Sequence, residues 1–183
     1  MSERYKFFDK ESLYFVSPTI VGWVDLFTKK QYAEIILNSL MYCQKEKGLI
    51  IHAWCIMSSH LHLIVSSQKE DLSAILRDFK KHTNKMIIEE LKNGVDSRKE
   101  WMLELFKKEA ETINRVTNYK VWQDGNHPIL LDSNTMLEQR LQYLHNNPVE
   151  SGLVVHAEDY IYSSAADYCD MTGLLKVTRI QLI

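Results

Sequence analysis

Cysteine is scarce in this sequence, and its few copies lie far apart. The three cysteines, Cys43, Cys55 and Cys169, form no CxxC pair, so neither a disulfide framework nor a zinc ribbon is expected. No apolar run approaches the roughly 18–20 residues that a bilayer-spanning helix needs. The first residues lack the apolar stretch of a signal peptide. These absences exclude a membrane-spanning protein and favour a cytoplasmic location with no membrane partner.

An excess of basic charge is missing too, because the formal net charge is −2 and the pI is about 6.4. A protein that binds duplex DNA nonspecifically is usually more basic, so any nucleic-acid contact must come from a local basic face. What is present is 45% hydrophobic and 25% charged residues, which supports a packed core and excludes a disordered chain. The 183 residues suit a single domain, expected over residues 1–183.

Hydrophobic periodicity predicts the order strand, helix, strand, strand, helix, followed by further helix and strand. Asp71 is expected to cap the second long helix, and Thr135 with Glu138 resembles a capping box for a later one. Pro148 predicts that this later helix ends at Asn147. The predicted strands cover residues 13–24, 49–57, 60–66 and 119–123, and the predicted helices cover 29–47, 71–93, 98–112 and a segment from 135. We therefore expect an α+β fold, a ferredoxin-like antiparallel sheet with helices packed on one face and additional C-terminal helices.

The sharpest chemical feature is the pair His60 and His62 on a predicted strand. Side chains at i and i+2 of a strand share a face, so the two imidazoles are expected side by side, outside the core. Two histidines with no cysteine nearby suit a borderline divalent cation that needs a third ligand. The alternative is that both residues lie on a solvent-facing strand without a metal.

A second feature is Tyr143, which shares a helix flank with Arg140 and Asn147 because residues three and four apart are neighbours. The tyrosine can offer its phenol to an open site, and Asn147 can offer an oxygen toward the same place. The alternative for Asn147 is an N-cap role ahead of Pro148. A metal held by two histidines could polarise a phosphate oxygen, and a tyrosine beside it could attack phosphorus.

The predicted helix over 71–93 carries a basic stripe. Arg77, Lys81 and Lys85 fall at i, i+4 and i+8, with Lys80 alongside. Such a stripe is usually a solvated face, but in a nuclease-like protein it would follow phosphates.

At these residues the sequence resembles the HUH single-strand DNA transposases, in the branch of REP-associated tyrosine transposases related to small insertion-sequence enzymes. The ordered blocks cover about residues 13–175. They are VGWVDLFTK, IMSSHLHLIV, ILRDFKKHTNK, VWQDGNHPI, YLHNNPVESGLV and YSSAADY. One departure is Ser58 and Ser59, where many relatives carry Pro-Asn; it falls in a turn.

The resemblance implies that His60 and His62 are metal ligands, Asn147 the third ligand and Tyr143 the nucleophile. It implies a metal-dependent endonuclease and strand transferase that cuts and rejoins hairpin-flanked single-stranded DNA through a 5′-phosphotyrosine, with Mg²⁺ or Mn²⁺. Trp122 and Gln123 match a family block of unassigned role, with core packing as the alternative for Trp122. Hence the candidate DNA contacts are Arg77, Lys80, Lys81, Lys85, Arg140, Trp122 and Gln123.

Three questions remain open from the sequence. The protein could be a domesticated hairpin-binding protein that no longer cuts, or a hydrolase in which water rather than Tyr143 attacks. The relatives also leave open a monomer, with the tyrosine acting in cis, or a homodimer that shares it.

Overall fold

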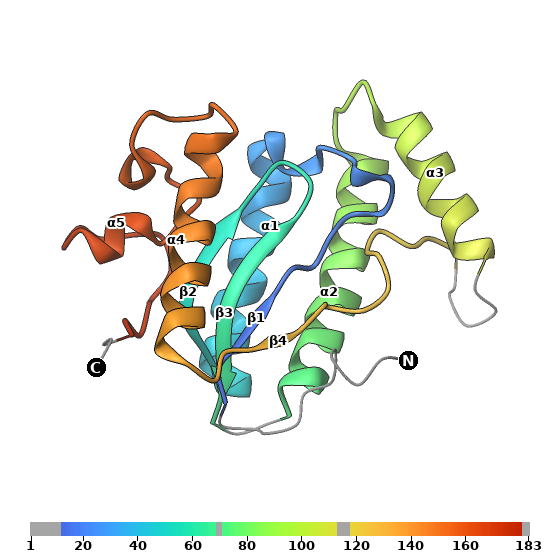
Figure 1. Ribbon diagram of the computed structural model, residues 1–183. Coiled ribbons are helices and arrows are strands. Elements are labelled where there is room, and N and C mark those ends of the chain that lie inside the picture. Colours follow the sequence, from blue (N-terminus) through green and yellow to red (C-terminus); the bar gives the residue numbers. More distant parts are fainter. Residues whose placement is uncertain (1–11, 69–70, 113–117, 181–183) are drawn as a thin grey trace.

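The computed structural model describes residues 12–68, 71–112 and 118–180, and it confirms the expected α+β class (Figure 1). Within these residues no helix is both long and apolar enough to span a membrane. The elements in chain order are β1 (Tyr14–Val16), the 3₁₀ turns Val21–Trp23 and Leu26–Thr28, α1 (Lys30–Tyr42) with a π turn (Cys43–Lys47), β2 (Leu49–Ile56), β3 (Leu61–Ser67), α2 (Leu72–Asn93), α3 (Lys99–Glu111), β4 (Ile129–Leu130), α4 (Asn134–Glu150), a 3₁₀ turn (Ala157–Asp159) and α5 (Ala165–Tyr168).

The sheet is antiparallel, with strand order β2-β3-β1-β4. The strands and helices of the sheet follow the order βαββαβ, with α1 between β1 and β2 and α2 between β3 and β4. The last strand differs from the expected one: residues 119–123 form only a single bridge, between Trp122 and Ile20, and β4 begins at Ile129, after the turn-rich segment. Alternation along β3 divides its side chains between two cores. Leu61 and Leu63 belong to the core under α1 and α2, whereas Ile64 belongs to a second core on the opposite face.

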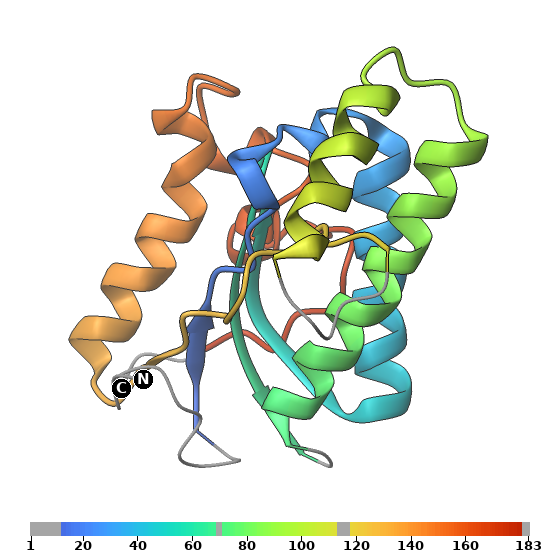
Figure 2. The same cartoon turned by 90° about the vertical axis from the view of Figure 1, so that its right-hand side faces the viewer.

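Helices cover both faces of this sheet rather than one. Figure 2 shows the sheet between α4 on one side and α1 and α2 on the other. The second core joins Phe15 and Ile64 of the sheet to Leu137 and Leu144 of α4. Helix α4, one of the expected additional C-terminal helices, therefore covers the face of the sheet opposite α1 and α2. It places Tyr143 on that face.

The structure confirms the predicted start of α2 and the glycine after the first long helix, but it places the start of α4 differently. The Asp71 carboxylate accepts a hydrogen bond from the Ser73 N–H at the start of α2, as expected of its cap. Gly48, with φ 75°, adopts the left-handed conformation that ends the π turn and starts β2. The cap of α4 is Ser133, whose hydroxyl accepts from the Met136 N–H, so the predicted Thr135 box was wrong.

Two predicted boundaries near prolines differ in the structure. The strand expected over 13–24 is regular only at Tyr14–Val16, and beyond Pro18 it continues as single bridges of Thr19 and Ile20. Helix α4 passes through Pro148 and ends at Glu150. A proline near the end of a helix removes one backbone bond while the following turn still closes, because Ser151 N–H donates to Asn147 C=O.

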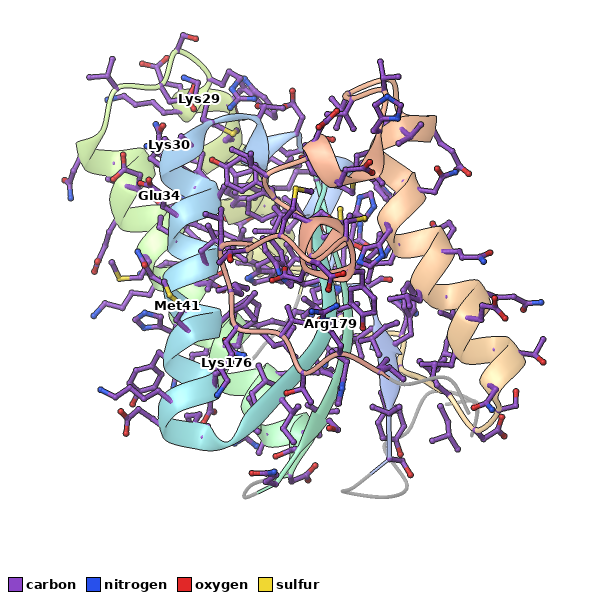
Figure 3. All side chains as sticks on the ribbon, turned by 90° about the vertical axis from the view of Figure 1, so that its left-hand side faces the viewer. Lys29, Lys30, Glu34, Met41, Lys176 and Arg179 are labelled. Carbon is purple, nitrogen blue, oxygen red and sulfur yellow. The ribbon has the colours of Figure 1, made fainter. Side chains whose placement is uncertain are left out.

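The segment after α5 protects the outer edge of the sheet. Figure 3 shows Lys176 and Arg179 on this segment, which passes the edge strand β2 beside α1. Thr178 N–H donates to Ile51 C=O at 2.9 Å, and the Gln44 amide donates to Lys176 C=O at 2.8 Å. The first bond covers a backbone carbonyl that the exposed edge of β2 would offer to another chain, and the second holds the segment to the π turn after α1.

Candidate active site

The two histidines of the HxH motif share one face of the sheet, as the strand period predicts. His62 lies on β3, and His60 pairs with Thr19 just before that strand. Their ring centroids are 4.6 Å apart, and the two Nε2 atoms are separated by 3.1 Å. The pair lies on the face that α4 covers.

Each imidazole is oriented by a serine hydroxyl at its other nitrogen. The Nδ1 atom of His62 lies 3.0 Å from Ser17 Oγ, and that of His60 lies 3.2 Å from Ser59 Oγ. When each Nδ1–H donates to its serine, each Nε2 holds a lone pair that faces the same space. The sequence analysis missed the role of both serines. Ser59 lies in the turn where the sequence differs from many relatives, and no local pattern links Ser17 to a histidine 45 residues away.

The expectation that neither imidazole belongs to the core was wrong for His62. Its side chain is buried, and its ring stacks on Phe15 with the centroids 5.4 Å apart. Burial lowers the pKa of His62 to about 3, helped by repulsion from His60 and Arg140, and burial also lowers the pKa of His60. Both imidazoles are therefore neutral near pH 7, which is the form that binds a metal.

Helix α4 places Tyr143 and Asn147 over this pair. The Tyr143 ring lies 5.2 Å from that of His62, yet the residue remains 41% exposed, so its side chain is open to solvent. One turn later, the Asn147 amide nitrogen lies 3.4 Å from His62 Nε2. A half-turn of the amide exchanges its nitrogen and oxygen, so Asn147 can present an oxygen to the same point.

The donor set fits a divalent cation. Two ligand atoms bound side by side at about 2.1 Å from one ion are about 3 Å apart, which matches the 3.1 Å between His60 Nε2 and His62 Nε2. No group of three His, Cys, Asp or Glu residues suited to a metal occurs in the described part of the chain. The Asn147 amide, which lies beside His62 Nε2, could supply an oxygen as a third protein ligand.

Arg140 supplies positive charge on the same side of α4 as Tyr143. Its guanidinium carbon lies 5.3 Å from the centre of the Phe15 ring, and its charge contributes to the lowered pKa of His62. A guanidinium beside a tyrosine and a neutral histidine pair can bind a phosphate through two parallel N–H donors.

The remaining candidates lie away from the pair. Arg77, Lys81 and Lys85 are exposed on α2, in the helix layer across the sheet from α4. The Lys80 ammonium donates to the carbonyls of Gln123 and Gly125, and burial lowers its pKa to about 8.

Trp122 and Gln123 are both held by internal hydrogen bonds. The Trp122 indole is buried and donates to Thr83 Oγ1 at 3.0 Å, which agrees with its core alternative. The Gln123 amide donates to Ile20 C=O at 3.1 Å. These two residues therefore hold their segment against α2 and the chain after β1.

Comparison with known proteins supports the resemblance seen in the sequence. Residues 24–109 match the family model described as "Transposase IS200 like", a span that includes both histidines and ends before α4. A solved REP-associated tyrosine transposase bound to a REP hairpin is similar in fold, with a TM-score of 0.65 and 17% identity over 100% of this chain and 96% of that one. No curated protein matches the sequence significantly. The family match and the fold confirm the resemblance to this group of transposases.

Proposed function

We propose that this chain, similar to the IS200-like transposases in sequence and to a REP-associated tyrosine transposase in fold, cuts and rejoins single-stranded DNA beside hairpins through a 5′-phosphotyrosine. The observation that carries the proposal is the convergence of Tyr143 and Asn147 on the His60–His62 pair. These residues come from distant parts of the chain, and only the α4 layer brings them together.

In the proposed reaction the Tyr143 oxygen attacks the scissile phosphorus. The bond from phosphorus to the 3′ oxygen breaks, the phenol loses its proton to solvent, and the leaving 3′ oxygen takes one up. Attack by a 3′-hydroxyl on the phosphotyrosine reverses these changes and rejoins DNA without ATP. Arg140 would hold the phosphate beside Tyr143, whose side chain is partly exposed.

A divalent cation at His60, His62 and Asn147 would offset the negative charge that develops on the phosphate. Mg²⁺ and Mn²⁺ are the candidates, and a set with two imidazoles favours Mn²⁺, because Mg²⁺ prefers oxygen ligands. The serines at each Nδ1 would fix the histidine rings for that role.

The decisive variant is Tyr143→Phe, which removes one oxygen and keeps the ring against His62. It should bind hairpin DNA as the parent protein does, but neither cut it nor form a covalent adduct. The parent protein should give an adduct on the 5′ side of the break that survives boiling in detergent, and a chelator should abolish it. The substrates are hairpin oligonucleotides copied from sequence flanking the gene, and the variant is compared with the parent on each one that the parent cuts.

The same assay separates the alternatives. Cleavage retained by Tyr143→Phe, with no adduct from the parent, would mean that water is the nucleophile. Binding without cleavage by either protein at any metal concentration, across all flanking hairpins, would indicate a hairpin-binding protein. A matched control is Tyr42→Phe, because Tyr42 is an exposed tyrosine on α1, in the opposite helix layer.

A further inference from the structure

Trp23 is a large exposed aromatic side chain next to the histidine pair. The residue is 63% exposed, and its ring meets the His60 ring edge to face with the centroids 5.7 Å apart. Tyr143 contacts His62 in the same pair. The indole therefore contacts one imidazole of the pair and the phenol contacts the other, and neither the sequence motifs nor the proposed chemistry gives Trp23 a role.

The backbone at Trp23 is strained. Its φ is 53°, a left-handed conformation that is rare for a bulky residue, and it directly follows Gly22 with φ 64°. Strain of this kind persists only where the surroundings impose it, and it clusters at functional sites. A residue such as asparagine would adopt this backbone more easily, so an exposed tryptophan here needs another explanation.

The turn that holds Trp23 is fixed on three sides. Ile20 N–H donates to Ser59 C=O, and Val21 N–H donates to Val121 C=O, each at 2.9 Å. A side chain at Gly22 would meet Leu105 of α3 at 3.0 Å, so the turn packs closely on that helix. The indole is thus an exposed ring on a rigid support beside a candidate DNA-cutting site.

We propose that Trp23 is a stacking platform for a base of the single strand, next to the scissile phosphate and on the His60 side of the site. The inference rests on the proposed function, because it assumes that the single strand to be cut lies at this site, and it adds a contact to a base of that strand. Every base has a face that stacks on an aromatic ring, so the contact holds the strand without reading its sequence. It would hold the strand beside His60 while Tyr143, beside His62, attacks the phosphate.

The test uses the full chain carrying Tyr143→Phe, so that DNA stays intact, and a labelled oligothymidine strand as the probe. Adding Trp23→Asn should weaken binding by about 5- to 150-fold, the range typical of removing one stacked base contact. Trp23→Phe should keep affinity within a few-fold because a ring remains. The salt dependence of binding should not change with Trp23→Asn, because the indole carries no charge.

Intrinsic fluorescence gives a readout that a purely structural role would not produce. The strand should quench the tryptophan emission of the Tyr143→Phe protein, and most of this quenching should be absent when Trp23→Phe is added. Asparagine suits the left-handed backbone, so Trp23→Asn should melt no lower than the parent. Tyr42→Ala, which removes an exposed ring from α1, is the control and should bind normally.

Unchanged affinity in Trp23→Asn, quenching that survives in Trp23→Phe, or a parent that does not bind the strand would each overturn the proposal. The two proposals fail separately. A protein with native Tyr143 that never cuts, but binds through Trp23, would contradict the proposed function alone. A protein that cuts equally well with Trp23→Asn and binds the strand unchanged would contradict only the stacking platform.

Discussion

At the scale of single residues, burial decides the chemistry of the site. His62 is enclosed by Phe15, Tyr143 and its own strand neighbours, and this enclosure, more than any charge, keeps its imidazole neutral. A neutral imidazole held by a serine hydroxyl is a ligand ready for a cation, without first losing a proton. Tyr143, which contacts the buried His62, is itself partly exposed, as the proposed nucleophile must be to meet a substrate.

The third ligand gives a residue-scale prediction. Asn147→Ala should lower the affinity for Mn²⁺ by about tenfold or more. Mutation of a residue that only hydrogen-bonds to a metal ligand already lowers metal affinity by about tenfold, and loss of a ligand should cost at least as much. Titration calorimetry of the protein without DNA measures it directly. Asn146→Ala is the matched control, since the Asn146 amide donates to Glu150 rather than toward the histidines. Equal Mn²⁺ affinity in both variants would remove Asn147 from the ligand set.

At the scale of elements, the helices meet through a buried carboxylate remote from the site. Asp96 accepts hydrogen bonds from Tyr32 of α1 and from Arg98 at the start of α3, and it pairs with Lys29 at 3.0 Å. Burial would raise the pKa of Asp96, but the donors from Arg98 and Lys29 outweigh it and hold that pKa well below its usual range. This carboxylate ties the start of α1 to the start of α3.

Asp96→Asn should therefore destabilise the fold by about 2 kcal/mol at pH 7, since buried donors lose a charged acceptor. A carboxylate whose pKa is depressed by folding adds stability above its unfolded pKa of about 3.9, and this stability is lost as pH falls below it. The difference between parent and variant should thus shrink toward pH 3 in urea unfolding. A difference that stays constant with pH would contradict this account of Asp96.

The basic stripe on α2 is an element-scale question as well. Because α2 lies across the sheet from α4, we propose that Arg77, Lys81 and Lys85 contact the stem of a hairpin rather than the strand being cut. Replacing all three with alanine should weaken hairpin binding and lower its log–log salt slope by about two to three units. Binding of an unpaired oligothymidine strand should barely change, and an unchanged slope for the hairpin would make the stripe a solvated face.

At the scale of the whole molecule, one chain holds every protein group that the proposed reaction uses. The sheet carries the histidines, and α4 of the same chain brings its own Tyr143 against them. Of the two arrangements left open by the sequence, we propose that the tyrosine acts in cis, because α4 packs on the sheet of its own chain.

Mixing two inactive proteins tests this arrangement. Tyr143→Phe and the double variant His60→Ala with His62→Ala should each lack cleavage, and an equimolar mixture should stay inactive when each chain uses its own tyrosine. The double variant must first be shown to fold by circular dichroism, because His62 is buried. Cleavage restored on mixing would instead establish a homodimer that shares its tyrosines.

Several features of this protein followed from the sequence alone because they depend on local geometry. The strand period of two places His60 and His62 on one face, and the helical period places Arg140, Tyr143 and Asn147 on one flank. The cap at Asp71 depends only on its neighbours along the chain. These residues could be grouped correctly before any fold was known.

The tertiary structure decided which groups meet, since that depends on contacts between residues far apart in the chain. Local periodicity could not show that α4 covers the second face of the sheet, which is what buries His62 and brings Tyr143 to it. It could not show that Ser17 orients His62 or that Trp122 fills the core beside Thr83. A period fixes the face on which a side chain lies, whereas the packing of distant elements fixes what that face touches.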